Sequence, residues 1–149
     1  MSLEKTCIDE THRLHRWLED WLTGASPSDA SAFAPFEAAI APGFEIVSPR
    51  GSRTSGPDVV AEIRAAHGAA PPDLKIRVEN AAIAHLIGDH ALVTYEEWHE
   101  SGGARSARLA TVLYREEPAA PGGVVWLHVH ETWLPGLAPP AGERFPEEG

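Results

Sequence analysis

The chain has 149 residues, 43% of them hydrophobic, a size and composition typical of one globular domain with its own core. Its formal net charge is −10, and an acidic protein is a poor partner for the phosphates of nucleic acid or for an anionic membrane surface. We therefore expect neither partner.

A single cysteine, Cys7, excludes an intrachain disulfide and fits a reducing compartment. The sequence contains no apolar run of the roughly 20 residues that cross a bilayer. Residues 1–5 lack the basic and then apolar order of a signal peptide. These features together predict a cytoplasmic protein.

The first helix has the clearest pattern in the sequence. Leucine and tryptophan recur in it at i, i+3, i+4 and i+7, which places them on one stripe, and Gly24 offers a left-handed cap. Trp17 and Trp21 are expected in the core or on the floor of an aromatic pocket. His12 and His15 are expected on the surface.

Two further helices and a short strand complete the first half of the chain. The second helix is expected to run to Ile40 and to be ended by Pro42–Gly43. A short strand follows over Phe44–Val47. The third helix is expected to begin at residues 55–58, with a proline in its first turn, and to end at Gly68.

From residue 74 onward the period of the apolar residues changes to two, which indicates strands. Four long strands separated by turns are expected over residues 74–86, 90–100, 105–116 and 124–134, the first of them bulged near Asn80–Ala81. The proline, glycine and acidic residues of 136–149 predict a loose tail.

Three helices before a run of long strands predict an α+β domain over residues 1–135. Long, twisted antiparallel strands with bulges curl, so three helices packed on the concave face leave a cone-shaped pocket. Both residue sets of the strands contain apolar side chains, and both faces therefore need cover. Because helices cover one face, we predict a homodimer through the other face of the sheet.

The order of these elements resembles the nuclear transport factor two-like superfamily, specifically its SnoaL-like members with their cystatin-like fold. The resemblance covers the chain from about Thr11 to Leu134. It rests on the tryptophan-rich first helix, the short strand, the Ser55–Pro57 helix start and the Trp126–His130 segment. That last segment also looks like the closing strand of the kinase association domains in this superfamily.

This resemblance implies a curled sheet with a pocket and usually a dimer. The superfamily includes isomerases, dehydratases and polyketide cyclases, and also members that only bind or assemble, so it implies no single activity. In the enzymatic members an Asp, His or Tyr of the pocket acts as acid or base.

Two strands supply the candidate catalytic residues. Tyr95, Glu97 and His99 share one face of a strand, and antiparallel order brings Glu131 and Trp133 near them. A carboxylate beside an imidazole serves acid–base chemistry, so Glu97, His99 and Glu131 are the candidate acids or bases. The alternative is a solvated strand end. Which face is concave stays open, because a shift of one residue in register exchanges the faces.

Arg108 lies mid-strand between apolar neighbours, and a buried arginine requires a carboxylate from the protein or from a ligand. The protein candidates are Glu96 and Glu97. Arg108 is therefore either an anchor for an acidic ligand or half of a pair across the dimer interface. The candidate ligand-binding residues are Trp17, Trp21, Tyr95, Arg108 and Trp133.

His128 and His130 lie two apart on a strand and face the same way, as two metal ligands would. The acid that a metal motif would place after them is missing, because Leu134 and Pro135 stand there. The alternative is that both histidines form hydrogen bonds within the sheet or at the dimer interface. We expect no metal and no cofactor.

Three hypotheses for function follow. The first is a small-molecule-binding protein, or a cofactor-independent isomerase, dehydratase or cyclase that transfers a proton next to a carbonyl. The second is a non-catalytic dimerisation or assembly module. The third is a metal-dependent enzyme that uses His128 and His130.

Overall fold

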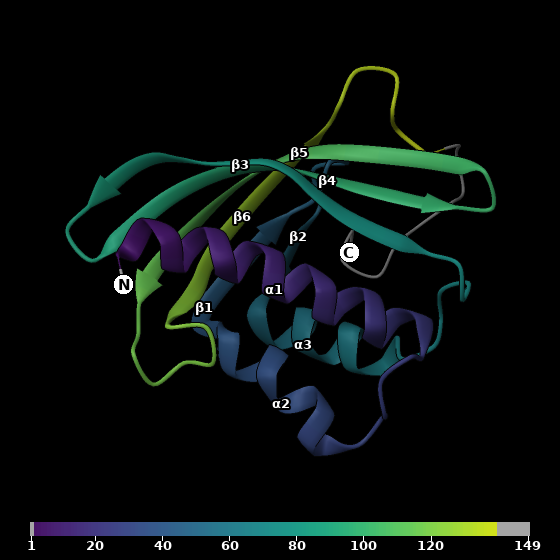
Figure 1. Cartoon of the computed structure of the whole chain (residues 1–149), viewed down its shortest axis with the longest axis horizontal. Coiled ribbons are helices and arrows are strands. Elements are labelled where there is room, and N and C mark those ends of the chain that lie inside the picture. Colours follow the sequence, from purple (N-terminus) through teal and green to yellow (C-terminus); the bar gives the residue numbers. More distant parts are fainter. Residues whose placement is uncertain (1, 140–149) are drawn as a thin grey trace.

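A computed structural model describes residues 2–139 of the chain, which form three helices and a six-stranded sheet. Figure 1 shows the long strands arched over the three helices, which lie together on one side. None of the helices in this range is both long and apolar enough to span a bilayer.

Helix α1 spans Leu3–Thr23 and begins at Ser2, whose side chain accepts a hydrogen bond from the Lys5 N–H. It ends at Gly24, which takes the left-handed conformation with φ of 80°, because the absence of a Cβ removes the strain there. The cap that the sequence predicts is therefore present.

Helix α2 (Ala30–Ala39) runs directly into strand β1 (Ile40–Val47). The helix ends one residue before the expected Ile40. The strand ends at Val47 as expected, but its expected start at Phe44 is wrong, because the strand already begins at Ile40. Proline has no N–H and disfavours helix in the residue before it, so the extended backbone starts ahead of Pro42. The register of β1 is irregular between Ile40 and Glu45.

Strand β2 (Arg53–Ser55) forms a hairpin with β1 and was not expected from the sequence. It leads directly into helix α3 (Gly56–Ala65). The Ser55 side chain caps this helix by accepting a hydrogen bond from the Asp58 N–H, and the proline occupies the first turn as predicted.

The second half consists of strands β3 (Lys75–Ile87), β4 (His90–Ser101), β5 (Ala104–Glu116) and β6 (Val124–Trp133). Each of these strands pairs antiparallel with the next one along the chain. Their bounds lie within one residue of the expected ones. The expected bulge in β3 is present at Asn80, which has a φ of 55° and lies within the register shift between Glu79 and Ala82.

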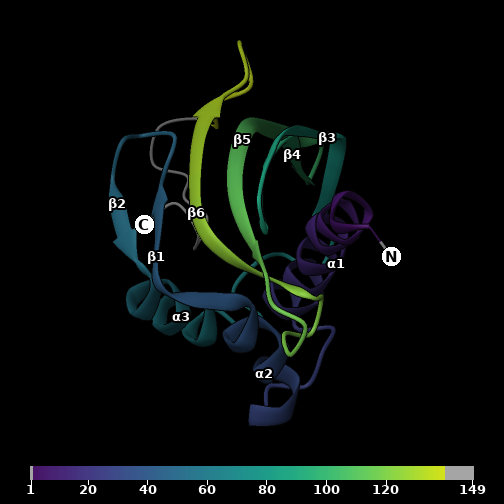
Figure 2. The same ribbon diagram turned by 90° about the vertical axis from the view of Figure 1, so that its left-hand side faces the viewer.

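The strand order is β2-β1-β6-β5-β4-β3, and β1 pairs with β6 in parallel. The sheet is therefore mixed, and the expectation of a purely antiparallel sheet is wrong. Viewed along its curl, the sheet bends from β2 round to β3, with α1 beside β3 and α3 beside β1 (Figure 2). The curled α+β architecture is the expected one.

The concave face carries the buried residue set of β4, which begins with Ala91, Val93 and Tyr95. The opposite face is more exposed, and Leu109 on it is 42% exposed. The concave side and the helices thus enclose the core.

The chain after β6 stays close to the sheet. Ala107 on β5 donates its N–H to the carbonyl of Leu137 and accepts from the N–H of Leu134. The start of the expected loose tail therefore lies along β5. The rest of that tail, residues 140–149, lies outside the described residues.

Candidate functional site

Strand β4 places three functional side chains on the concave face. Tyr95, Glu97 and His99 follow one another at a spacing of two, so their side chains all point into the cone. Each is only 2% exposed. The register thus determines the concave face that the sequence left open.

The neighbouring strands extend this set into two rows across the sheet. In one row Glu97 stands opposite Arg108, which stands opposite Trp133. In the next row Ala110 separates Tyr95 from Glu131. The sheet therefore brings one arginine and two glutamates together on a concave surface.

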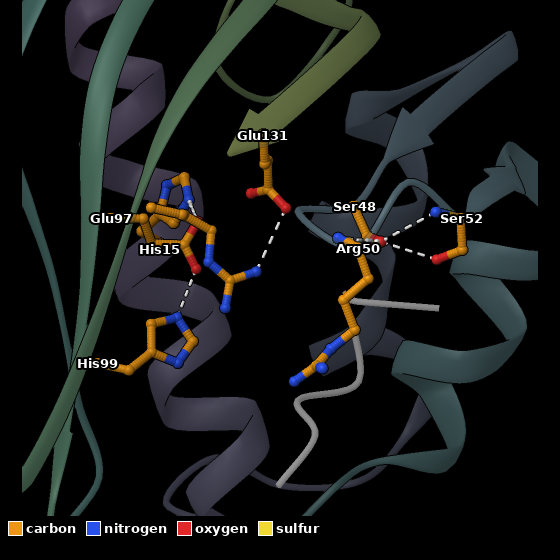
Figure 3. Close-up of polar contacts among 8 residues, drawn as sticks. His15, Ser48, Arg50, Ser52, Glu97, His99 and Glu131 are labelled. Atoms are coloured by element: carbon orange, nitrogen blue, oxygen red, sulfur yellow. Dashed lines mark hydrogen bonds and ion pairs between the residues drawn. The ribbon is translucent and has the colours of Figure 1, made fainter. Parts of the chain in front are cut away.

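The carboxylate of Glu97 lies between two imidazoles (Figure 3). Its Oε1 is 2.9 Å from Nε2 of His15, and its Oε2 is 2.5 Å from Nε2 of His99. Burial alone would raise the pKa of Glu97. The charge and hydrogen bond of His15, the hydrogen bond of His99 and the charge of Arg108 outweigh burial and hold this pKa well below its ordinary value.

The guanidinium of Arg108 is fully buried and forms an ion pair with Glu131 at 3.3 Å. Its Cζ also lies 4.9 Å from the ring centre of Trp133, a cation–π distance. The expectation that Glu96 pairs with Arg108 is wrong, because Glu96 lies on the opposite face of β4 and accepts a hydrogen bond from Trp98.

The phenol of Tyr95 remains protonated at neutral pH. Burial raises its pKa well above the ordinary value, the negative charges of Glu97 and Glu131 raise it further, and the charge of Arg108 opposes them. The Tyr95 ring meets that of His15 edge-on, with centroids 5.2 Å apart. Tyr95 therefore contributes a hydrogen-bond donor to the site.

A cavity of about 60 Å³ adjoins this cluster. Its polar wall is formed by His15, Tyr95, Glu97 and Glu131. Its other walls are apolar side chains of the three helices, β1 and β6: Leu14, Leu18, Phe36, Ile40, Phe44, Ile46, Val59, Ile63, Trp126 and Val129. The arrangement suits a few apolar atoms that end at a polar wall.

His15 was expected on the surface, and the structure shows that this is wrong, since His15 is only 5% exposed. Its position, one helical turn after Thr11 and three residues before Leu18, was a usable signal, because both of those residues are buried.

Sequence reasoning also missed Arg50, which lies in the turn between β1 and β2. Its Cζ lies 6.0 Å from the ring centre of Trp133. Figure 3 shows its side chain extending toward the space beside Glu97, His99 and Glu131. In the same turn the hydroxyls of Ser48 and Ser52 form a hydrogen bond. No periodic pattern in the sequence marks a turn residue of this kind.

The two tryptophans of α1 pack behind the cavity. Trp21 donates its Nε1–H to the carbonyl of Ile63 and stacks on Trp17 with centroids 5.3 Å apart. Trp17 stacks in turn on Phe36, which lines the cavity. The structure therefore places both tryptophans in an aromatic layer under the cavity, and neither lines it.

His128 and His130 lie on the outer face of the sheet, away from this cluster. Nδ1 of His128 is 3.8 Å from a carboxylate oxygen of Glu45. Within residues 2–139, no three His, Cys, Asp or Glu side chains are grouped so as to hold a metal ion. Both histidines instead line a shallow hollow of about 430 Å³ beside Leu92, Leu109 and Leu113.

Comparison with curated proteins finds similarity to plant sucrose-phosphatases. The chain is 27% identical over 131 residues to sucrose-phosphatase 2 of Nicotiana tabacum and 24% identical over 125 residues to a probable sucrose-phosphatase 2 of Arabidopsis thaliana. The matches cover 87% and 83% of this chain, but 31% and 29% of those proteins. The chain thus spans about a third of the length of the curated relatives it matches.

Comparison with solved structures finds the same fold in several proteins. An NTF2-like protein of unknown function from Pseudomonas aeruginosa has a TM-score of 0.77 and 28% identity, covering 87% of this chain and 98% of that one. The CaMKII hub of S. rosetta has a TM-score of 0.69 and 15% identity, covering 90% and 98%. The expected NTF2-like, cystatin-like fold is confirmed.

The family within this superfamily follows from a family model described as Sucrose-6-phosphate phosphohydrolase C-terminal. That model matches residues 12–135, from the middle of α1 to just beyond β6. The match includes every strand of the sheet and every residue of the buried cluster. The chain therefore belongs to the sucrose-6-phosphate phosphohydrolase C-terminal family.

Proposed function

We propose that this chain is a small-molecule-binding domain whose ligand enters the cone at its polar end and places an apolar part in the cavity. The observation that carries the proposal is the convergence of buried ionisable side chains on one wall of an otherwise apolar cavity. Of these side chains, His15, Glu97 and Glu131 line the cavity. His99 and Arg108 lie behind that wall, in contact with Glu97 and Glu131 respectively.

The energetics of burial support a functional role for this cluster. Removing a charge from water costs several kcal/mol even in a paired state, and apolar side chains of similar volume are often at least as stable there. The neighbouring row of the same face is apolar, with Val93, Val112 and Val129 in register. A change from apolar to ionisable side chains along one surface is typical of a binding or catalytic site.

The same groups support acid–base chemistry as the finer form of this proposal. Glu97, His99 and Glu131 are the candidate acids or bases, and Tyr95 or Arg108 would polarise a carbonyl oxygen. Such a site would act as a cofactor-independent isomerase, dehydratase or cyclase. Arg108, Tyr95 and Trp133 would contact the ligand directly, whereas Trp17 and Trp21 would support the cavity from behind.

A series of linear alcohols tests the binding proposal, because each has an apolar chain and one polar end. We expect the affinity of 1-propanol, 1-butanol and 1-pentanol to rise roughly fourfold for each methylene buried, since a buried methylene contributes about 0.8 kcal/mol. The measurement is an NMR titration of backbone amides, in which saturable shifts are expected around Tyr95, Glu97 and Val129.

The variant Val129→Phe fills the cavity and should abolish the gain in affinity with chain length. The matched control is Leu109→Phe, on the outer face of the neighbouring strand, which should bind the alcohols as the wild type does. Equal binding by Val129→Phe and the wild type would show that the cavity is not the site.

The names of the plant relatives suggest sucrose 6-phosphate as a further probe. A disaccharide is far too large for a cavity of about 60 Å³. We therefore expect neither sucrose nor sucrose 6-phosphate to displace 1-pentanol from the wild-type protein. Displacement by either sugar would mean that the cone opens to take a larger ligand than we propose.

We further propose that the outer face of the sheet joins two copies of the chain in a homodimer. The support is the hollow beside Leu92, Leu109 and Leu113, where apolar side chains line a sheet face that no helix of residues 2–139 covers. The cytoplasmic location that we also propose fits the single cysteine, Cys7, which is buried as a thiol.

A further inference from the structure

The two buried tyrosines of the concave face differ in how their hydroxyl groups are bonded. The hydroxyl of Tyr114 lies 2.7 Å from Oγ1 of Thr11. Thr11 donates its own proton to the carbonyl of Cys7, 2.8 Å away, so Tyr114 is the donor to Thr11. Within residues 2–139, the hydroxyl of Tyr95 has no hydrogen-bond partner, although Tyr95 is only 2% exposed. A buried tyrosine hydroxyl usually has a partner, so Tyr95 requires an explanation.

The unpaired hydroxyl of Tyr95 opens into the cavity. Its oxygen is not one of the fully enclosed unpaired atoms of the described chain, so it keeps some accessible surface. Tyr95 is shielded from solvent and lines the cavity, so this surface faces the cavity. The cavity therefore has an unpaired polar group on a wall that is otherwise mostly apolar.

The other three polar residues that line the cavity already have partners within the protein. Each carboxylate oxygen of Glu97 contacts an imidazole nitrogen. Glu131 forms an ion pair with Arg108. The ring nitrogens of His15 contact a backbone carbonyl and Glu97. Among the cavity-lining residues of the described range 2–139, Tyr95 is thus the one whose polar group the protein leaves for a ligand.

The surroundings of Tyr95 determine which ligand atom suits it. Burial raises the pKa of its phenol well above the ordinary value, and the negative charges of Glu97 and Glu131 raise it further, against the charge of Arg108. The phenol therefore keeps its proton and donates it. The two carboxylates line the same cavity, so they disfavour a negatively charged ligand there. An uncharged acceptor atom fits both conditions.

We propose that the Tyr95 hydroxyl orients the ligand of this cavity by donating a hydrogen bond, and that the ligand is an uncharged carbonyl compound with a short alkyl chain. A carbonyl oxygen only accepts, so it matches a wall whose unpaired group is a donor. The alkyl chain then packs on the apolar walls. This ligand class rests on the proposed small-molecule function, whereas the unpaired hydroxyl of the free protein does not.

Urea unfolding without ligand tests the unpaired hydroxyl. Tyr95→Phe removes a buried polar group that has no partner, so we expect its urea midpoint to equal or exceed that of the wild type. Tyr114→Phe is the matched control, because it removes a hydroxyl that donates to Thr11, and its midpoint should fall. A fall in Tyr95→Phe as large as that in Tyr114→Phe would overturn the proposal.

The ligand class is tested with 2-butanone and 2-methylbut-1-ene, in which a methylene group replaces the carbonyl oxygen. We expect Tyr95→Phe to bind 2-butanone roughly two- to tenfold more weakly than the wild type, the contribution of one neutral hydrogen bond, and the alkene no more weakly. Tyr114→Phe should bind both probes as the wild type does, because Tyr114 does not line the cavity. NMR titration of backbone amides measures these affinities.

The outcomes separate this inference from the proposed function. Binding of 2-butanone by Tyr95→Phe as tight as by the wild type, or an equal loss of both probes, would overturn the role of the hydroxyl. Butanoate should not displace 2-butanone, and displacement would overturn the preference for an uncharged ligand. If the wild type binds neither probe while Tyr95→Phe keeps its stability, the proposed binding function is wrong, and the ligand class is wrong with it.

Discussion

Glu97 is the single residue on which the buried cluster depends most. Replacing it by Gln removes the buried carboxylate that contacts the imidazoles of His15 and His99, so we expect the free energy of unfolding at pH 7 to fall by about 3–5 kcal/mol. Because folding lowers the pKa of Glu97, its contribution is present above the ordinary value of 4.5 and is lost as pH falls through the folded value. Urea unfolding at pH 7 and pH 4 measures both effects.

Wild type should therefore lose more stability between pH 7 and pH 4 than Glu97→Gln does. Glu96→Gln is the control, because Glu96 lies on the outer face with its carboxylate near Asn80 and Trp98. We expect this control to unfold within about 0.5 kcal/mol of wild type, as most surface substitutions do. Equal acid sensitivity of Glu97→Gln and wild type would contradict the charged state assigned to Glu97.

For single residues, the sequence predicts the direction of a side chain where the residue lies in a regular helix or strand. Tyr95, Glu97 and His99 share a face because strands alternate. The burial of His15 was not predicted, because the buried face of α1 is wider than its stripe of tryptophan and leucine residues indicates. Arg50 lies in a turn, and only the three-dimensional hairpin brings its side chain toward Trp133.

Helix α1 packs closely against the loop that joins β5 to β6, and the contact is between Glu10 of the helix and Gly122 of the loop. A Cβ on Gly122 would lie 1.9 Å from Oε1 of Glu10. Glu10 is held by hydrogen bonds from Arg13 at 2.6 Å and from the indole of Trp126 at 2.9 Å, so it resists moving aside. We expect Gly122→Ala to lower the free energy of unfolding by about 1–3 kcal/mol, the usual range for overpacking.

Urea unfolding checks this prediction, with Ala119→Ser in the same loop as the control, since Ala119 is exposed. Adding Glu10→Ala to Gly122→Ala should remove the steric part of the loss, because the clashing carboxylate is then absent. A Gly122→Ala variant as stable as Ala119→Ser would show that the loop does not depend on this close approach.

The sequence predicted long strands accurately and missed the shortest one. The four long strands have enough alternating positions to determine both their type and their ends. Strand β2 has three residues and no measurable period, and it exists only because β1 pairs with it. The parallel pairing of β1 with β6 joins segments far apart in the chain, and no local pattern specifies it.

At the scale of the whole molecule, the outer sheet face predicts association. Replacing Leu109, which is 42% exposed, by Glu puts a charge into the proposed interface. We expect wild type to sediment as a dimer and Leu109→Glu as a monomer in analytical ultracentrifugation. Leu86→Glu is the control, because Leu86 is 47% exposed on the edge strand β3, away from the hollow.

A monomeric wild type, or a dimeric Leu109→Glu variant, would contradict association through this face. The sequence supplied the argument for a covered second face from the apolar residues on both sides of the strands. It could not show which of the two faces the helices cover, because that depends on register. The structure assigns the helices to the face of Glu97 and leaves Leu109, on the other face, 42% exposed.

The central claim is that the cone binds a small molecule between its apolar cavity and its buried charges. The most direct measurement is a crystal structure of the wild-type protein soaked with 1-pentanol. We predict electron density for the alkyl chain beside Leu14 and Val129, with the hydroxyl oxygen beside Tyr95, Glu97 and Glu131. A cavity that holds only ordered water, with the alcohol absent or bound elsewhere, would contradict this claim.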